Sequence, residues 1–248
     1  MNLSEVEGTV INDDATDVLA KMPDGCVDLI FTDPPYLKKF FHCYKLLFQH
    51  AARLLKDGGS LITIVPSYNW ENVLALNILA SPERKLKWRW DLEMNMGAHS
   101  HARLGMGIVV GHKPMGWWVK GSWPTGRGFV EDTVPVRAPS KKLHAWQQDI
   151  SWCDYYIGRI CPPGGLVLDP FAGSGTAGIA CLLHDRRFIG IEVDPVHAVR
   201  ANLRLSEFDP VLARAVQIEM FPKETRWKDH RSKRPSYKSW TLEGRLTE

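Results

Sequence analysis

Hydrophobic and polar positions follow two alternating periods along the first third of the chain. Residues 6–11 and 27–32 form apolar runs with the length and β-branched content of buried strands, and a short helix-type segment lies between them. The stretch "KKFFHCYKLLFQHAARLLKDGG" then has apolar residues at helical spacing, and "SLITIV" follows as another apolar run. This β-α-β order predicts a parallel sheet with helices on its faces.

The same rhythm returns near residue 150. We expect helices over 150–160, 176–184 and 195–205, with strands over 166–170 and 187–194. Between residues 81 and 142 regular periodicity is lost, and Trp, Gly, His and Pro crowd together. This stretch is therefore predicted to be an inserted hairpin region with long loops, which is where recognition residues tend to lie.

The composition fits a globular α/β protein. The chain has 248 residues, of which 44% are hydrophobic and 24% charged, so it can bury a sizeable core. A formal charge of +3 permits a polyanionic partner without requiring one. We see no secretory signal and no apolar segment long enough for a bilayer, and the 5 scattered cysteines indicate neither a disulfide framework nor a zinc site.

One stretch has the pattern of a nucleotide-type site. In "LVLDPFAGSGT" an apolar strand ends at Asp169, a turn carries Gly173 and Gly175, and a helix opens at Thr176. The turn lacks the full glycine pattern of dinucleotide binders and the lysine of a phosphate loop, which favours an adenosyl ligand without a pyrophosphate. Glu192, at the end of the next strand, is placed to accept hydrogen bonds from two ribose hydroxyls.

A second stretch, "TDPPY", suggests chemistry on an aromatic amine. The Asp33 carboxylate and the Pro34 carbonyl could each accept one N–H of an exocyclic amine, which directs the nitrogen lone pair at a methyl group. Proline holds this backbone rigidly, and Tyr36 can stack on the ring of the amine. Taken alone, the four residues could also be an ordinary turn after a strand.

Together, "TDPPY" and "LDPFAGSGT…FIGIEVDP" resemble the DNA amino-methyltransferases, specifically the permuted class in which the catalytic motif precedes the cofactor loop. The resemblance implies a Rossmann-like α/β fold with a mostly parallel seven-stranded sheet and helices on both faces. It also implies S-adenosylmethionine as methyl donor and a flipped-out adenine or cytosine in double-stranded DNA as acceptor. The aspartate form of the tetrapeptide is typical of adenine-N6 enzymes, whereas cytosine-N4 enzymes of this class more often carry serine.

Carried over by position, the resemblance assigns two groups of site residues. The expected catalytic residues are Asp33, Pro34, Pro35 and Tyr36. The expected cofactor-binding residues are Asp14, His144, Asp169, Phe171, Ala172, Gly173, Ser174, Gly175, Thr176 and Glu192. Two places depart from the family. Asp13 replaces a glycine before Asp14, and "HAWQQD" lacks a lysine that the family has near the methionyl end of the cofactor.

The resemblance also divides the chain. We expect a catalytic half over 1–80, a target-recognition region over 81–142, a cofactor-binding half over 143–221 and a basic tail over 222–248. The candidate DNA-binding residues are Lys38, Lys39, Arg103, Lys113, Lys120, Trp123 and Arg127. His99 and His101 lack a third ligand in register, so no metal site is expected.

Other functions stay open at this point. The same chemistry could act on cytosine-N4 in DNA, or on an amine in RNA or in a protein glutamine. A non-catalytic nucleic-acid-binding subunit with a methyltransferase fold is a further alternative, although it has little need of both Asp33 and Glu192. We expect a cytoplasmic, nucleoid-associated protein, or one in the host cytoplasm if viral, that is a monomer or a homodimer.

Overall fold

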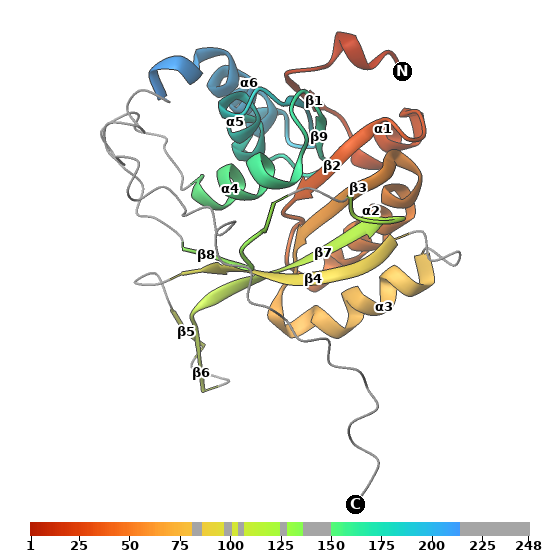
Figure 1. The fold of residues 1–248 in the computed structure, drawn as a ribbon, viewed down its shortest axis with the longest axis vertical. Helices are drawn as coiled ribbons and strands as arrows, with labels where there is room; N and C mark the ends of the chain where they lie inside the picture. Colours follow the sequence, from red (N-terminus) through yellow and green to blue (C-terminus); the bar gives the residue numbers. More distant parts are fainter. Residues whose placement is uncertain (81–85, 97–100, 104–106, 125–127, 136–149, 214–248) are drawn as a thin grey trace, which may run out of the picture.

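A single large sheet between two layers of helices organises the molecule (Figure 1). The computed structural model describes residues 1–80, 86–96, 101–103, 107–124, 128–135 and 150–213. Within these residues the sheet has 8 strands in the order β1-β10-β9-β2-β3-β7-β4-β8. The strand bounds are Thr9–Asn12 (β1), Val27–Thr32 (β2), Leu55–Ile64 (β3), Leu86–Asn95 (β4), His112–Lys120 (β7), Thr133–Pro135 (β8), Leu166–Asp169 (β9) and Arg187–Glu192 (β10).

The sheet is mostly parallel, as the sequence predicts. In this sheet β7 runs antiparallel to both of its neighbours, β3 and β4, and the remaining strands all share one direction. The sheet has one strand more than the 7 that the family resemblance implies, because the short β8 adds to the edge beside β4. A separate two-stranded sheet pairs β5 (His101–Arg103) with β6 (Ile108–Val110).

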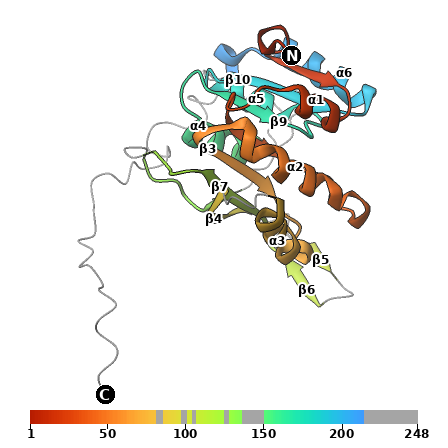
Figure 2. The same ribbon diagram turned by 90° about the vertical axis from the view of Figure 1, so that its right-hand side faces the viewer.

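Two helical layers cover the sheet (Figure 2). One face carries α4 (Ser151–Ile160), α5 (Thr176–Leu183) and α6 (Pro195–Glu207), and the other carries α1 (Ala15–Lys21), α2 (Phe41–Leu54) and α3 (Trp70–Ala80). Alternate residues of a strand therefore enter different cores. Phe31 packs on the α4–α6 side and Ile30 on the α1–α3 side, which explains why β2 is apolar almost throughout.

The tryptophan-rich stretch is not a loop insertion in its described part. β4, β7 and β8 come from this stretch and belong to the main sheet. Trp117 and Trp118 lie on opposite faces of β7, are nearly fully buried, and help to build the two cores. A strand that is buried on both faces shows no alternation of polar and apolar residues, so the sequence pattern did not predict a core strand here.

The strand order reverses at one point of the sheet, and ligands commonly bind at such a point. From β2 the chain proceeds to β3 on one side, and from β9 it proceeds to β10 on the other, so the order reverses between the paired strands β2 and β9. In open α/β sheets, ligands bind beyond the carboxyl ends of the strands at such a switch point. Thr32 and Asp169 end these two strands, so both motifs meet there. No helix in the described part of the chain has the length and apolar character that crossing a membrane requires.

Candidate active site

Asp33 follows β2 directly and has one carboxylate oxygen engaged and one orphaned. Its Oδ2 accepts a hydrogen bond of 2.7 Å from the Tyr36 hydroxyl. Its Oδ1 is buried and has no hydrogen-bond partner among the described residues. Desolvation raises the pKa of Asp33, while the Tyr36 hydrogen bond and the charge of Lys113 oppose that rise. A buried acceptor without a donor is costly, so this oxygen indicates a place for an incoming N–H.

Tyr36 lies at the open side of this carboxylate. The residue is 36% exposed, while Pro34 is buried and Pro35 is exposed. Tyr68, in the short helix η3 (Ser67–Asn69), donates its hydroxyl to the Tyr36 carbonyl oxygen. The Lys113 Nζ lies 5.6 Å from the centroid of the Tyr36 ring. Tyr68 thus fixes the backbone of Tyr36, while Lys113 and the hydrogen bond to Asp33 lie at its side chain.

Asp169 lies beside Asp33 across the switch point. Its Oδ1 accepts a 2.6 Å hydrogen bond from Thr32 Oγ1 and a 3.2 Å hydrogen bond from the Phe171 N–H. Burial raises the pKa of Asp169 to about 7, and the nearby charges of Asp33 and Glu192 add to the rise. The catalytic motif and the glycine turn are therefore joined by a direct hydrogen bond and by electrostatic interaction.

The glycine turn after β9 has the backbone that its sequence predicts. Gly173 and Gly175 have φ of +50° and +75°, in the left-handed region that glycine adopts without strain. Glu192 Oε2 accepts from the Gly173 N–H at 2.8 Å, and its Oε1 accepts from the Asp194 N–H at 2.9 Å. Each oxygen retains a second lone pair, so the carboxylate is fixed in place yet able to accept further hydrogen bonds.

The remaining predicted cofactor residues lie around this turn. Phe171 packs against the α1–α3 core, Ala172 is buried, and Ser174 and Thr176 place their hydroxyls 3.2 Å apart. Arg204 of α6, which the sequence analysis did not select, contacts both of these hydroxyls. No local sequence pattern connects Arg204 to the glycine turn, because the contact forms only when α6 packs beside the turn in the folded protein.

Asp14 begins α1 just past the carboxyl end of β1. Its Oδ1 caps the helix by accepting from the Thr16 N–H at 2.7 Å, and hydrogen bonding to Thr16 lowers the pKa of Asp14. Asn12, which the sequence analysis also did not select, donates from Nδ2 to the Glu192 carbonyl at 3.0 Å. Both residues thus lie on the edge of the sheet that carries Glu192.

The structure separates the candidate DNA-binding residues. Lys38 and Lys39 lie exposed in the short helix η2 (Lys38–Phe40), directly after the tetrapeptide. Lys113 is at the start of β7, and Lys120 is at its end. Because β7 is antiparallel, Lys113 reaches the carboxyl edge of the sheet with Tyr36, whereas Lys120 lies at the opposite edge, donating to the Leu55 carbonyl at 2.6 Å.

Trp123 also lies away from the catalytic motif. Its ring packs edge-on against Trp117 with a centroid distance of 4.9 Å, and the Arg89 guanidinium lies 5.0 Å from the Trp123 ring centroid. Lys120 and Trp123 are therefore not grouped with the candidate DNA-binding residues beside Tyr36. Arg103 falls in β5 by its backbone, and His99, Arg127, His144 and the basic tail lie outside the described residues.

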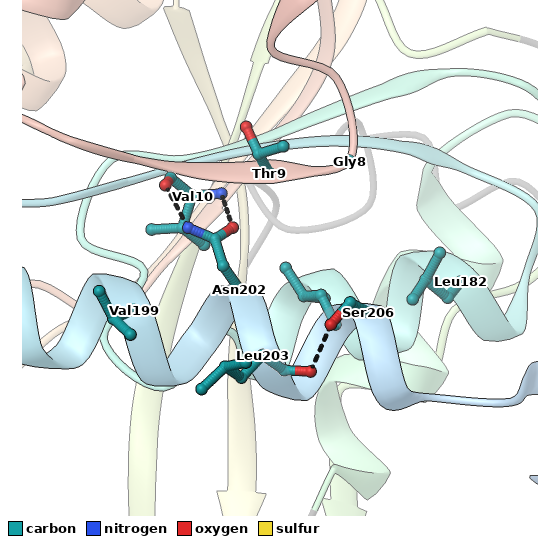
Figure 3. A pocket seen from close by; sticks show the side chains of 9 residues that line it. Gly8, Thr9, Val10, Leu182, Val199, Asn202, Leu203 and Ser206 are labelled. Carbon is teal, nitrogen blue, oxygen red and sulfur yellow. Dashed lines mark hydrogen bonds between the residues drawn. The ribbon is translucent and has the colours of Figure 1, made fainter.

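Metal-ligating side chains and pockets bear on the kind of site that the described residues can form. Among them, no group of His, Cys, Asp and Glu side chains could hold a metal ion. A pocket of about 680 Å³ lies between the start of β1 and α6 (Figure 3), away from the carboxyl edge. There the Asn202 side chain bonds both the N–H and the carbonyl of Val10 at 2.8 Å, which closes the edge of β1 and offers no catalytic group.

Known proteins share both the sequence pattern and the fold. Residues 118–202 match the DNA methylase family of N6 and N4 amino-methyltransferases. The chain is 27% identical to the type II methyltransferase M.BamHI of Bacillus amyloliquefaciens, covering 87% of this chain and 62% of that protein. It is 29% identical to the DNA adenine methyltransferase YhdJ of Escherichia coli, covering 79% and 81% of the two chains.

The chain is thus similar to the DNA amino-methyltransferases, by a family match over residues 118–202 and by relatives of 27–29% identity.

A solved structure supports the fold of this chain. The complex of M1.HpyAVI with SAM superimposes with a TM-score of 0.62 and 23% identity, covering 79% of this chain and 98% of that one. The predicted family and the predicted Rossmann-like α/β fold are thereby confirmed. The chain spans 62% of the length of M.BamHI.

Proposed function

We propose that this protein transfers a methyl group from S-adenosylmethionine to the exocyclic N6 amine of a flipped-out adenine in double-stranded DNA. The observation that supports this most is the buried, unpartnered Oδ1 of Asp33, beside an aromatic ring and next to the glycine turn. An N–H donor entering here would satisfy a group that the protein leaves unsatisfied.

Asp33 and Pro34 would prepare the amine. Asp33 Oδ1 accepts one N–H, and we assign the Pro34 carbonyl as acceptor of the other. The two hydrogen bonds favour a tetrahedral nitrogen whose lone pair faces the donor. The Asp33 carboxyl is largely desolvated, which strengthens such hydrogen bonds. Tyr36 is assigned to stack on the base, and its exposed ring beside the carboxylate is consistent with that role.

The residues around the glycine turn fit an adenosyl donor. Glu192 is fixed by two amides and keeps lone pairs for ribose hydroxyls, while Gly173 leaves open space where a side chain would otherwise extend. Asp14 lies at the same edge and is assigned to the adenine amino group of the donor. When bound, S-adenosylmethionine supplies an electrophilic methyl group, and the protein's part is to place the two reactants in line.

Exposed cations next to the catalytic motif support a DNA substrate. Lys38 and Lys39 are exposed directly after the tetrapeptide, and Lys113 lies over Tyr36. Such cations can bind the phosphates beside a flipped nucleotide. We assign further target recognition to the region 81–142 and a cytoplasmic location, with the protein acting as a monomer or homodimer.

Adenine is preferred over cytosine because of Asp33. The aspartate form of the tetrapeptide resembles that of adenine enzymes, and YhdJ, a relative with 29% identity, is a DNA adenine methyltransferase. Cytosine-N4 is the second candidate, since the matched family covers both amines and the same two acceptors would serve either base.

The test is nucleoside mass spectrometry on unmethylated duplex DNA incubated with the purified protein and S-adenosylmethionine. We expect N6-methyladenine, and we expect its loss in Asp33→Ala. Asp57→Ala is the matched control, because Asp57 is an exposed carboxylate in β3 away from the motif. Detection of N4-methylcytosine instead would support the same mechanism with cytosine as the target base. No methylated nucleoside from folded protein would refute the proposed function.

A further inference from the structure

Arg204 lies beneath the glycine turn and contacts it from α6. Its Nη1 donates to the Ser174 carbonyl at 3.0 Å, to Thr176 Oγ1 at 3.2 Å and to Ser174 Oγ at 3.4 Å. The residue is half-buried, and burial lowers the pKa of its guanidinium. A single side chain from another helix thus holds the turn that precedes α5.

The charge of Arg204 has no carboxylate counterpart in the described part of the chain. The oxygens that it contacts there belong to a carbonyl and two hydroxyls, all of them neutral. Partly buried cations are normally paired, because moving a charge out of water is unfavourable. The ion pairs in the same part of the chain involve other cations, such as Arg53 with Asp24 and Arg187 with Glu7. A negatively charged group on a bound ligand would neutralise the charge of Arg204.

The proposed donor carries such an anion. S-adenosylmethionine ends in an amino acid with a carboxylate. Arginine has donors only, so the Ser174 and Thr176 hydroxyls accept from it. The two hydroxyls also lie 3.2 Å apart, so one of them donates to the other. The charge of Arg204 makes the electrostatic potential at these hydroxyls and at the turn more positive, which favours a negatively charged group beside them.

We propose that Arg204 is a positioning residue for the carboxylate of the methyl donor, acting through Ser174 and Thr176 and through its own charge. This inference rests on the proposed function, since it names how one end of that donor is held. It assigns to α6 a part of the cofactor site that the sequence motifs leave open.

The experiment compares two ligands by isothermal titration calorimetry. S-adenosylhomocysteine carries the carboxylate, whereas its decarboxylated analogue, S-adenosyl-3-thiopropylamine, keeps the amine and lacks the carboxylate. In Arg204→Met we expect affinity for S-adenosylhomocysteine to fall about tenfold. Affinity for the analogue should change less than about twofold, which is within ordinary surface effects. Arg200→Met is the matched control, since Arg200 is exposed one turn earlier on α6.

Each outcome decides a different point. Equal losses for both ligands would show that Arg204 only supports the turn, and unchanged affinities would show that it has no role, so either result overturns the inference. If wild-type protein binds neither ligand, the proposed function itself fails. Should Arg204→Met not fold, Arg204→Lys and Arg204→Gln replace it, and only the lysine variant should keep the preference for the carboxylate.

Discussion

Replacing Asp169 by asparagine should make the stability of the ligand-free protein less sensitive to pH. Asp169 is buried, and desolvation raises the pKa of its carboxyl to about 7. The hydrogen bonds from Thr32 Oγ1 and from the Phe171 N–H both end on Oδ1. The carbonyl oxygen of an asparagine can accept both, so Asp169→Asn removes the titration while keeping the local geometry.

The sign and size follow from proton linkage. A carboxyl whose pKa is higher in the folded than in the unfolded protein binds a proton in the folded state that the unfolded state has lost. Its stabilisation is complete below the ordinary value of 3.8 and declines as the pH rises to about 7. At about 1.4 kcal/mol for each pKa unit, the full decline is about 4 kcal/mol. Between pH 5 and 7 it is about 2–3 kcal/mol.

Urea unfolding at pH 5, 6, 7 and 8 measures this directly. We expect the free energy of unfolding of the wild type, minus that of Asp169→Asn, to fall by about 1.4 kcal/mol per pH unit up to pH 7 and then to level off. Asp57→Asn, at an exposed carboxylate, controls for the general effect of removing a charge. A difference that stays constant from pH 5 to 8 would refute the argument, because it would show Asp169 ionised throughout.

Three further changes test the site and its support. Lys113→Met removes a charge that lowers the pKa of Asp33, so the acidic limb of the pH profile of the methylation rate should shift to higher pH. Lys113→Arg keeps the charge and should leave the profile unchanged. If the acidic limb does not move in Lys113→Met, this electrostatic role is excluded. Tyr68→Phe removes the hydrogen bond to the Tyr36 carbonyl, so kcat should fall about fivefold with donor affinity unchanged, as measured by initial rates and calorimetry. Gly116→Ala should cost about 1–3 kcal/mol in thermal or urea unfolding, because its Cβ would lie 2.1 Å from the Trp118 ring; wild-type stability would contradict the packing.

Much of the fold could be predicted because its signals are local. β2 occupies residues 27–32 as predicted, and the glycine turn after Asp169 has the positive φ angles that its glycines suggest. The tetrapeptide and the turn were also paired correctly, since both follow strands and the structure joins Thr32 to Asp169. Such features depend on residues a few positions apart, whose spacing is visible in the chain.

The region around β4 and β7 could not be predicted in the same way. Trp117 and Trp118 were expected among recognition loops, yet they fill the two cores on either side of β7. Their burial depends on β3 and β4 lying alongside and on helices above and below, and nothing within the segment reports those neighbours. The same holds for Arg204, whose partners lie about 30 residues away in the chain.

By itself, the sequence determined the strand-turn-helix units, the family resemblance and the positions of the two motifs, because each is a short pattern of residue types at fixed spacing. The tertiary structure alone decided which residues share the carboxyl edge with those motifs. Lys113 and Lys120 end the same strand, and only the antiparallel course of β7 places the first beside Tyr36 and the second at the far edge. The direction of a strand depends on its pairing with distant segments, so it cannot be predicted from the residues of the strand alone.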